Sequence, residues 1–80
     1  MRCKDKYGID YPNTLVALKV IRKTWKVLAK DLDCDPTRFP AWTRGTSIPR
    51  YEVQDRIFEI ARRELSGEQL YRFGFEENAA

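Results

Sequence analysis

Apolar residues recur along this chain at the three- and four-residue spacing of amphipathic helices. Leu15, Leu18 and Ile21 mark the first such run, and residues 51–64 carry the clearest apolar face. No alternating run between turn signals predicts a pair of strands. The pattern therefore predicts an all-α fold, a small bundle of four to five helices, with helices near residues 12–22, 25–33, 36–44 and 51–64 and a short helical turn near 67–72.

The helix expected over residues 36–44 has clear signals at both ends. Asp35 can act as N-cap with Pro36 at the first helical position, and Gly45 suits a left-handed residue after the last turn. Pro40 lies inside this helix, where it removes a backbone donor and strains the residue before it. We therefore expect this helix to be kinked, to begin as a 3₁₀ turn, or to start later.

Eighty residues are enough for one small domain with a single core. We expect that domain to span residues 12–75, with a flexible arm over 1–11 and a frayed tail over 76–80. The apolar faces of the expected helices predict which side chains fill the core: Leu15, Leu18, Leu28, Ala29, Leu32, Phe39, Trp42, Val53, Ile57 and Ile60.

Three aromatic residues, Tyr71, Phe73 and Phe75, follow the last expected helix closely. They are too many for a free tail, because exposed aromatic rings leave a large apolar surface in water. They either close the core of the monomer or form a two-fold interface. For a homodimer, we expect these three residues to lie at the contact.

The residues available for chemistry are few. The chain has no histidine, and Cys3 and Cys34 lack the spacing of metal ligands, so neither a metal nor a cofactor is expected. The carboxylates of 52–64 alternate with arginines as a surface lattice would, which argues against an enzyme. A single pair of cysteines indicates reduced thiols, as in the cytoplasm. Because no signal-peptide or membrane-spanning pattern is present either, we expect a cytoplasmic protein.

Charge is distributed unevenly along the chain. Residues 19–50 hold eight basic groups against three aspartates, a net charge of +5, whereas residues 51–80 have a net charge of −3. A basic middle suggests a polyanionic partner, and a merely solvated face is the alternative.

Residues 24–49, TWKVLAKDLDCDPTRFPAWTRGTSIP, contain the most specific pattern in the chain. This stretch resembles, without a gap, the helix-turn-helix of the phage repressor and Cro-type (Xre) family, whose pattern reads roughly T-Q-x-x-L-A-x-x-L-G-V-S-x-x-x-I-S-x-W-E-x-G-x-x-x-P. Seven residues are identical to that pattern: Thr24, Leu28, Ala29, Leu32, Trp42, Gly45 and Pro49. Phe39 holds the apolar position usually given to isoleucine.

The resemblance implies a lambda-repressor-like fold and a sequence-specific, DNA-binding transcriptional regulator of phage, plasmid or bacterial type. In that family the third helix enters the major groove of double-stranded DNA, and a homodimer binds. Bases are reached from the positions matching Pro36, Thr37, Pro40 and Ala41, and phosphates near Trp25, Arg44, Thr46 and Ser47. With the exposed basic groups added, the expected DNA-binding residues are Lys26, Lys30, Pro36, Thr37, Arg38, Ala41, Arg44, Thr46, Ser47 and Arg50.

An alternative function stays open, because some residues depart from the family pattern. Trp25 replaces a glutamine, and Pro36 and Pro40 cannot hydrogen-bond a base edge. The chain could therefore use the helix-turn-helix scaffold as a protein-interaction module, an antirepressor or an inhibitor of polymerase or of a repressor. The basic run from Lys19 to Lys30 favours DNA, and the acidic C-terminal half favours a protein partner.

Overall fold

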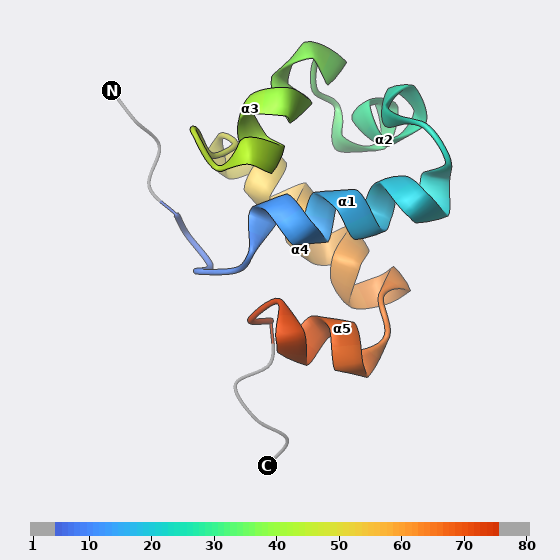
Figure 1. Cartoon of the computed structure of the whole chain (residues 1–80), viewed down its shortest axis with the longest axis vertical. Helices are drawn as coiled ribbons and strands as arrows, with labels where there is room; N and C mark the ends of the chain where they lie inside the picture. The colour runs from blue at the N-terminus through green and yellow to red at the C-terminus, as the bar shows by residue number, and fades with distance from the viewer. Residues whose placement is uncertain (1–4, 76–80) are drawn as a thin grey trace.

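Every regular element is helical within residues 5–75, the part of the chain that the computed structural model describes (Figure 1). The predicted all-α class and the count of four to five helices are confirmed for this range. The expectations for residues 1–4 and 76–80 lie outside the described residues. The elements are α1 (Tyr11–Arg22), α2 (Trp25–Leu32), the 3₁₀ turn η1 (Pro36–Arg38), α3 (Phe39–Arg44), α4 (Tyr51–Glu64) and α5 (Gly67–Arg72).

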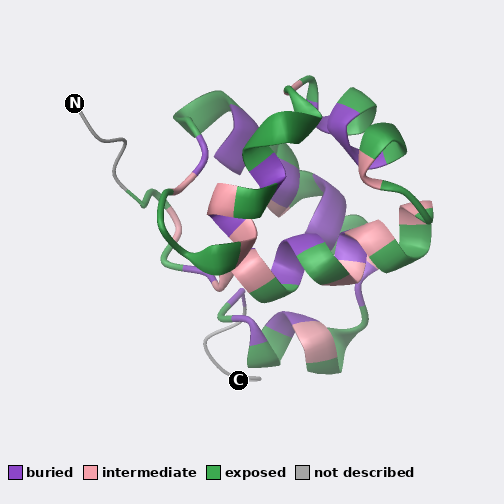
Figure 2. Cartoon of the chain, turned by 45° about the horizontal axis from the view of Figure 1, so that its top comes forward, coloured by how far each residue is buried: buried purple, intermediate pink, exposed green. Residues whose placement is uncertain are grey.

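Helix α1 is the central element of the bundle. It crosses α4 and packs against α2, α3 and α4, while α5 lies at the opposite end from α3 (Figure 1). Buried residues line the inward side of the helices and exposed residues the outside (Figure 2). Helices α2, α3 and α5 have only six to eight residues each. Isolated helices this short are unstable in water, so tertiary packing must hold them.

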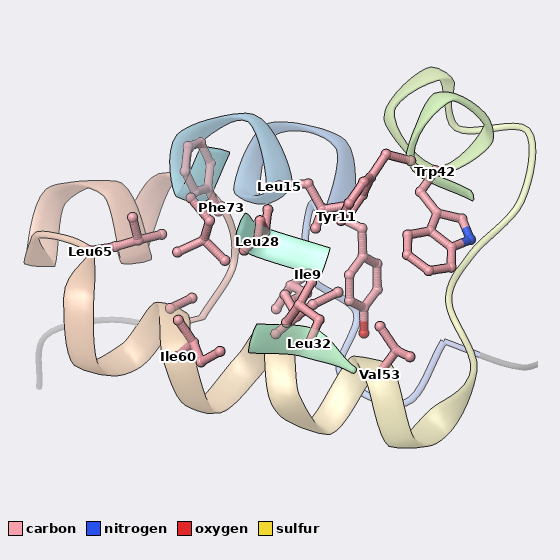
Figure 3. Packing of buried hydrophobic residues seen from close by; sticks show 14 of the residues in the cluster. Ile9, Tyr11, Leu15, Leu28, Leu32, Trp42, Val53, Ile60, Leu65 and Phe73 are labelled. Carbon is pink, nitrogen blue, oxygen red and sulfur yellow. The ribbon is translucent and has the colours of Figure 1, made fainter. Parts of the chain in front are cut away.

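All ten residues expected in the core are buried. Side chains from α1, α2, α3 and α4 point into one shared interior, with Leu15, Leu28, Trp42 and Val53 among those visible in Figure 3. The described chain also buries apolar residues beyond these ten: Ile9, Tyr11, Ala61, Leu65, Leu70, Phe73 and Phe75.

Of the three outcomes expected for the third helix, the structure shows the 3₁₀ start. Asp35 caps it, since its carboxylate accepts the Thr37 backbone N–H at 3.0 Å. The Phe39 N–H bonds the Pro36 carbonyl three residues back. Pro40 has no N–H with which to close an α-helical turn onto that carbonyl. Residues 36–38 therefore form η1, and the α-helical geometry begins at Phe39.

Residues 5–11 differ from the flexible arm expected over 1–11. Ile9 and Tyr11 are buried, and the Asp10 N–H donates to the Phe73 carbonyl at 2.8 Å. The Lys6 N–H donates to the Gln54 side chain at 2.8 Å. These contacts make residues 5–11 part of the domain. Spacing along the sequence gave no sign of them, because both partners lie more than 40 residues away.

Gln54 links three segments of the fold from inside the core. Its side chain is fully buried, and its Oε1 also accepts the Tyr11 hydroxyl at 3.1 Å. Its Nε2 donates to the Pro49 carbonyl at 2.7 Å. Burial raises the pKa of the Tyr11 hydroxyl, which keeps it protonated and able to donate. Because an unpaired buried amide is costly, this network fixes how α1 and the chain before α4 approach each other.

Two of the three residues expected at a homodimer contact lie inside the monomer. Phe73 and Phe75 are both buried, and the Phe75 ring lies 5.0 Å from that of Phe58 on α4. They close the monomer core, which was the other option open from the sequence. Tyr71 is 63% exposed and is the one of the three still available to a partner.

Replacing Trp42 by alanine should lower the free energy of unfolding by about 3–5 kcal/mol, because the large buried ring leaves a cavity that neighbours fill poorly. Urea titration followed by circular dichroism measures this. Val20→Ala is the matched control: Val20 is 69% exposed, so the change should stay within about 0.5 kcal/mol. Similar losses in both variants would contradict the burial of Trp42.

Candidate nucleic-acid interface

Helix α2, the turn at residues 33–35, η1 and α3 form one packed unit, called here the α2–α3 segment (residues 25–44). Leu28 and Ala29 of α2 and Phe39 and Trp42 of α3 are all buried in the same cluster. The Phe39 and Trp42 rings meet edge to face, with centroids 5.6 Å apart. Helix α2 packs against η1, and both α2 and α3 pack against α1. This packing fixes the direction of the outward side chains.

Trp25 takes part in that packing. Its ring centroid lies 4.6 Å from that of Phe39, and the residue is half-buried. An indole N–H is a single donor, whereas the glutamine of the family pattern offers two donors and an acceptor. Trp25 therefore extends the aromatic cluster at the place where that pattern has a polar side chain.

Left-handed residues end both helices of the α2–α3 segment. Asp33 follows α2 with φ 56°, and Gly45 follows α3 with φ 78°. A side chain at Gly45 would meet no atom within 4 Å, so the backbone conformation alone favours glycine there. Thr46 then closes the end of α3, since its N–H and its hydroxyl each donate to the Ala41 carbonyl at 3.1 Å. The Thr46 hydroxyl proton is therefore already in use.

The structure brings some of the remaining site residues together and leaves the others apart. A groove between α3 and the start of α4 is lined by Arg38, Thr46, Ser47 and Arg50. Several other candidates lie outside the residues that line it. Lys26 and Lys30 are exposed four residues apart on α2, Pro36 and Thr37 are exposed on η1, Arg44 is exposed on α3, and Ala41 is half-buried.

An aspartate shares the groove with the two arginines. Asp35 is one of its lining residues, and the Thr37 backbone N–H, followed by the Thr37 hydroxyl at 2.9 Å, lowers the pKa of its carboxyl. Asp35 therefore stays ionised at neutral pH and offsets part of the positive charge. The sequence predicted Asp35 as an N-cap. That Asp35 lines the same groove as Arg38 and Arg50 is known only from the fold.

Arg22 does not belong to the exposed basic surface. Its guanidinium pairs with Asp31 of α2 and with Glu64 of α4, and Nη2 lies 2.7 Å from a Glu64 oxygen. Only 17% of the Arg22 side chain is exposed. The pKa of Glu64 is lowered by this bond and that of Arg22 is raised. Arg22 therefore joins three helices and contributes little to attracting a polyanion.

Cys34 packs half-buried against the core, and burial raises the pKa of its thiol. A protonated thiol is a poor nucleophile, so this cysteine is structural. Within residues 5–75 no group of three or more His, Cys, Asp or Glu side chains could hold a metal ion. None of the described helices is both long enough and apolar enough to cross a membrane.

The chain matches no family model, no curated protein and no solved structure.

Glu64→Gln should lower the free energy of unfolding by about 1–3 kcal/mol at pH 7, because Arg22 loses a partly buried partner. The lowered pKa of Glu64 means that its stabilisation is complete above the pKa of an unfolded glutamate, about 4.3. It is lost as the pH falls through the lower folded-state value. Urea titrations at pH 7 and pH 3 should therefore show the difference between wild type and variant shrinking in acid.

Glu68→Gln is the control for this measurement, because the Glu68–Arg72 pair is exposed. That variant should change stability by less than about 0.5 kcal/mol at either pH. Equal effects of the two variants, or a Glu64→Gln effect independent of pH, would argue against the buried pair.

Proposed function

We propose that this protein is a sequence-specific DNA-binding transcriptional regulator of phage, plasmid or bacterial type. The observation that carries the proposal is the set of basic side chains exposed on and beside the α2–α3 segment: Lys26, Lys30, Arg38, Arg44 and Arg50. The order of two short helices, a tight turn and a longer following helix supports a helix-turn-helix. In that layout α2 crosses the DNA backbone and η1–α3 enters the major groove.

Basic side chains of α2 and of the loop before α4 are the proposed contacts to DNA phosphates. Lys26 and Lys30 lie on one side of α2, four residues apart, which suits contacts along one strand. Arg50 precedes α4 and shares a groove with Ser47. Each lysine or arginine that meets a phosphate releases counterions, so binding should weaken steeply with salt.

Base reading depends on fewer groups. Arg38 is exposed on η1, and its forked guanidinium can pair both acceptors of a guanine. The Thr37 hydroxyl donates to Asp35, so the part of Thr37 that it offers a base is its methyl group. Ala41 likewise offers a methyl, and such groups contact the methyl of thymine. Sequence preference would then combine one arginine, methyl contacts and the shape of the duplex.

A second function has its own supporting observation. Asp35 is ionised in the groove, and Pro36 and Pro40 are exposed on the same segment. A carboxylate there repels phosphate, which favours the alternative that the segment binds another protein, as an antirepressor or an inhibitor of polymerase or of a repressor would. Failure to bind random duplex even at low salt would favour this alternative.

A homodimer is part of the DNA-binding proposal, since two α3 helices on one face of DNA read half-sites about one helical turn apart. Tyr71 is the exposed aromatic residue that such a contact would use. Sedimentation at tens of micromolar should show a dimer with duplex present. A monomer alone, with and without duplex, would contradict this part of the proposal.

Arg38→Ala should cost about 1–3 kcal/mol on a selected binding site and much less on random duplex, because it removes a base contact. Lys26→Ala should weaken binding to both duplexes equally, because it removes a phosphate contact. It should also reduce the slope of log affinity against log salt concentration by about one. Fluorescence titrations across salt measure both, with the site first selected from a random library.

Arg72→Ala serves as the control, because Arg72 is exposed on α5, far along the chain from the α2–α3 segment. It should leave both affinities unchanged. If Arg38→Ala weakens binding to both duplexes equally, Arg38 is another phosphate contact. The protein would then recognise sequence through the shape of the DNA. If all three variants bind as wild type does, DNA is not the ligand.

A further inference from the structure

The outer side of α1 carries an apolar surface that the fold does not use. Val16 is 46% exposed, Val20 is 69% exposed and Ile21 is 42% exposed. Val16 and Val20 are four residues apart, so they lie one above the other on the same face. Helix α1 lies in the foreground of Figure 1, with no other described element drawn over it. Ile21 lies about 100° further round the helix from Val20, so we call only Val16 and Val20 the α1 face.

The folding of the helix does not explain these residues. Valine and isoleucine are weaker helix formers than alanine, lysine or glutamate, because their branched side chains lose rotamer freedom. At an exposed position they gain little burial in return. Single exposed apolar residues are ordinary, whereas two neighbours on one helix face form a small continuous apolar patch that a partner can cover.

The charges around the α1 face are of one sign. The sequence of α1 contains no acidic residue, and Lys19 and Lys23 lie beside the valines at its C-terminal end. Asp10 and Asp31, the acidic residues before and after α1 in the sequence, are engaged elsewhere. Asp10 accepts the Asn13 backbone N–H at 3.0 Å as N-cap of the helix, and Asp31 pairs with Arg22. The α1 face is therefore aliphatic with a positive rim.

We propose that the α1 face is a docking site for an acidic amphipathic helix of a partner protein. Aliphatic residues of the partner, at three- and four-residue spacing, would pack on Val16 and Val20, as in other helix-mediated recognition. Its carboxylates would meet Lys19 and Lys23. Charge complementarity of this kind raises the rate of encounter and fixes the orientation of the partner.

The same observations argue against two other occupants. Nucleic acid would be drawn to the lysines, but its phosphates gain nothing from two aliphatic side chains, and DNA interfaces are polar. A second copy would place one lysine-rimmed face against another. It would also fall far short of the roughly 20–30 residues a side of a stable interface. A short helix that docks transiently fits a surface of this size better.

The test uses the full-length chain labelled with ¹⁵N and a synthetic amphipathic peptide of about 16 residues, long enough to lie along α1. The peptide carries leucine at three- and four-residue spacing and glutamate elsewhere, and a second peptide carries lysine in place of glutamate. The glutamate peptide should shift the amide signals of residues 13–23 and leave those of 36–44 unchanged. The lysine peptide should not bind.

Val20→Gln should raise the dissociation constant of the glutamate peptide about tenfold or more, because one apolar contact is lost. Glutamine is a good helix former, so this variant should keep the fold. Tyr51→Gln is the matched control, because Tyr51 is 45% exposed on α4; it should leave the peptide affinity unchanged. Val20→Gln should also leave binding to duplex DNA unchanged, which keeps this test separate from the proposed function.

Four outcomes would overturn the proposal. The first is no binding of the glutamate peptide up to about 1 mM, the weak end of measurable affinity. The second is equal weakening by Val20→Gln and Tyr51→Gln. The third is a shift of residues 13–23 with protein concentration alone, which would make a second copy the occupant. The fourth is a loss of DNA affinity in Val20→Gln, which would place the α1 face in the DNA interface.

Discussion

Burial of the Phe39 and Trp42 rings holds the six-residue helix α3 in place. A helix of that length has too few hydrogen bonds to persist in water, so its geometry comes from the core beneath it. The rings pack edge to face and lie in the same buried cluster as Leu28 and Ala29 of α2. The positions of the exposed arginines on η1 and α3 follow from this packing. The proposed interface therefore depends on a hydrophobic contact that no nucleic acid would touch.

Two polar side chains, the buried Gln54 and the half-buried Arg22, link further parts of the fold around that contact. Gln54 joins the chain before α1, α1 itself and the loop before α4 through three hydrogen bonds. Arg22 joins α1 to α2 and α4 through Asp31 and Glu64. Each link costs stability if one partner is removed, because the other is left partly desolvated. The Arg22 pairs tie α2 to α1 and α4, and Gln54 holds the loop that follows α3 through the Pro49 carbonyl.

Local features were predictable from the sequence, and long-range polar contacts were not. Helix period and caps predicted the ten core residues, the Asp35 cap, the left-handed Gly45 and the 3₁₀ start before Pro40. The partners of Arg22 lie up to 42 residues away, and a charged residue on a helix gives no sign of whether it is paired. Because its pairing could not be seen in the sequence, Arg22 was included among the eight basic groups of residues 19–50. Whether Phe73 and Phe75 turned inward was equally open, because aromatic rings suit a core and an interface alike.

The most direct test of the account is to map the contact with a short random duplex by the amide signals of the ¹⁵N-labelled protein at low and moderate salt. The account predicts shifts at Lys26, Lys30, Arg50 and residues 36–47 that weaken as salt rises, because phosphate contacts release counterions. Residues 67–75 should stay unchanged as an internal control. No shift at low salt, or shifts confined to α4 and α5, would contradict the claim that the α2–α3 segment binds DNA.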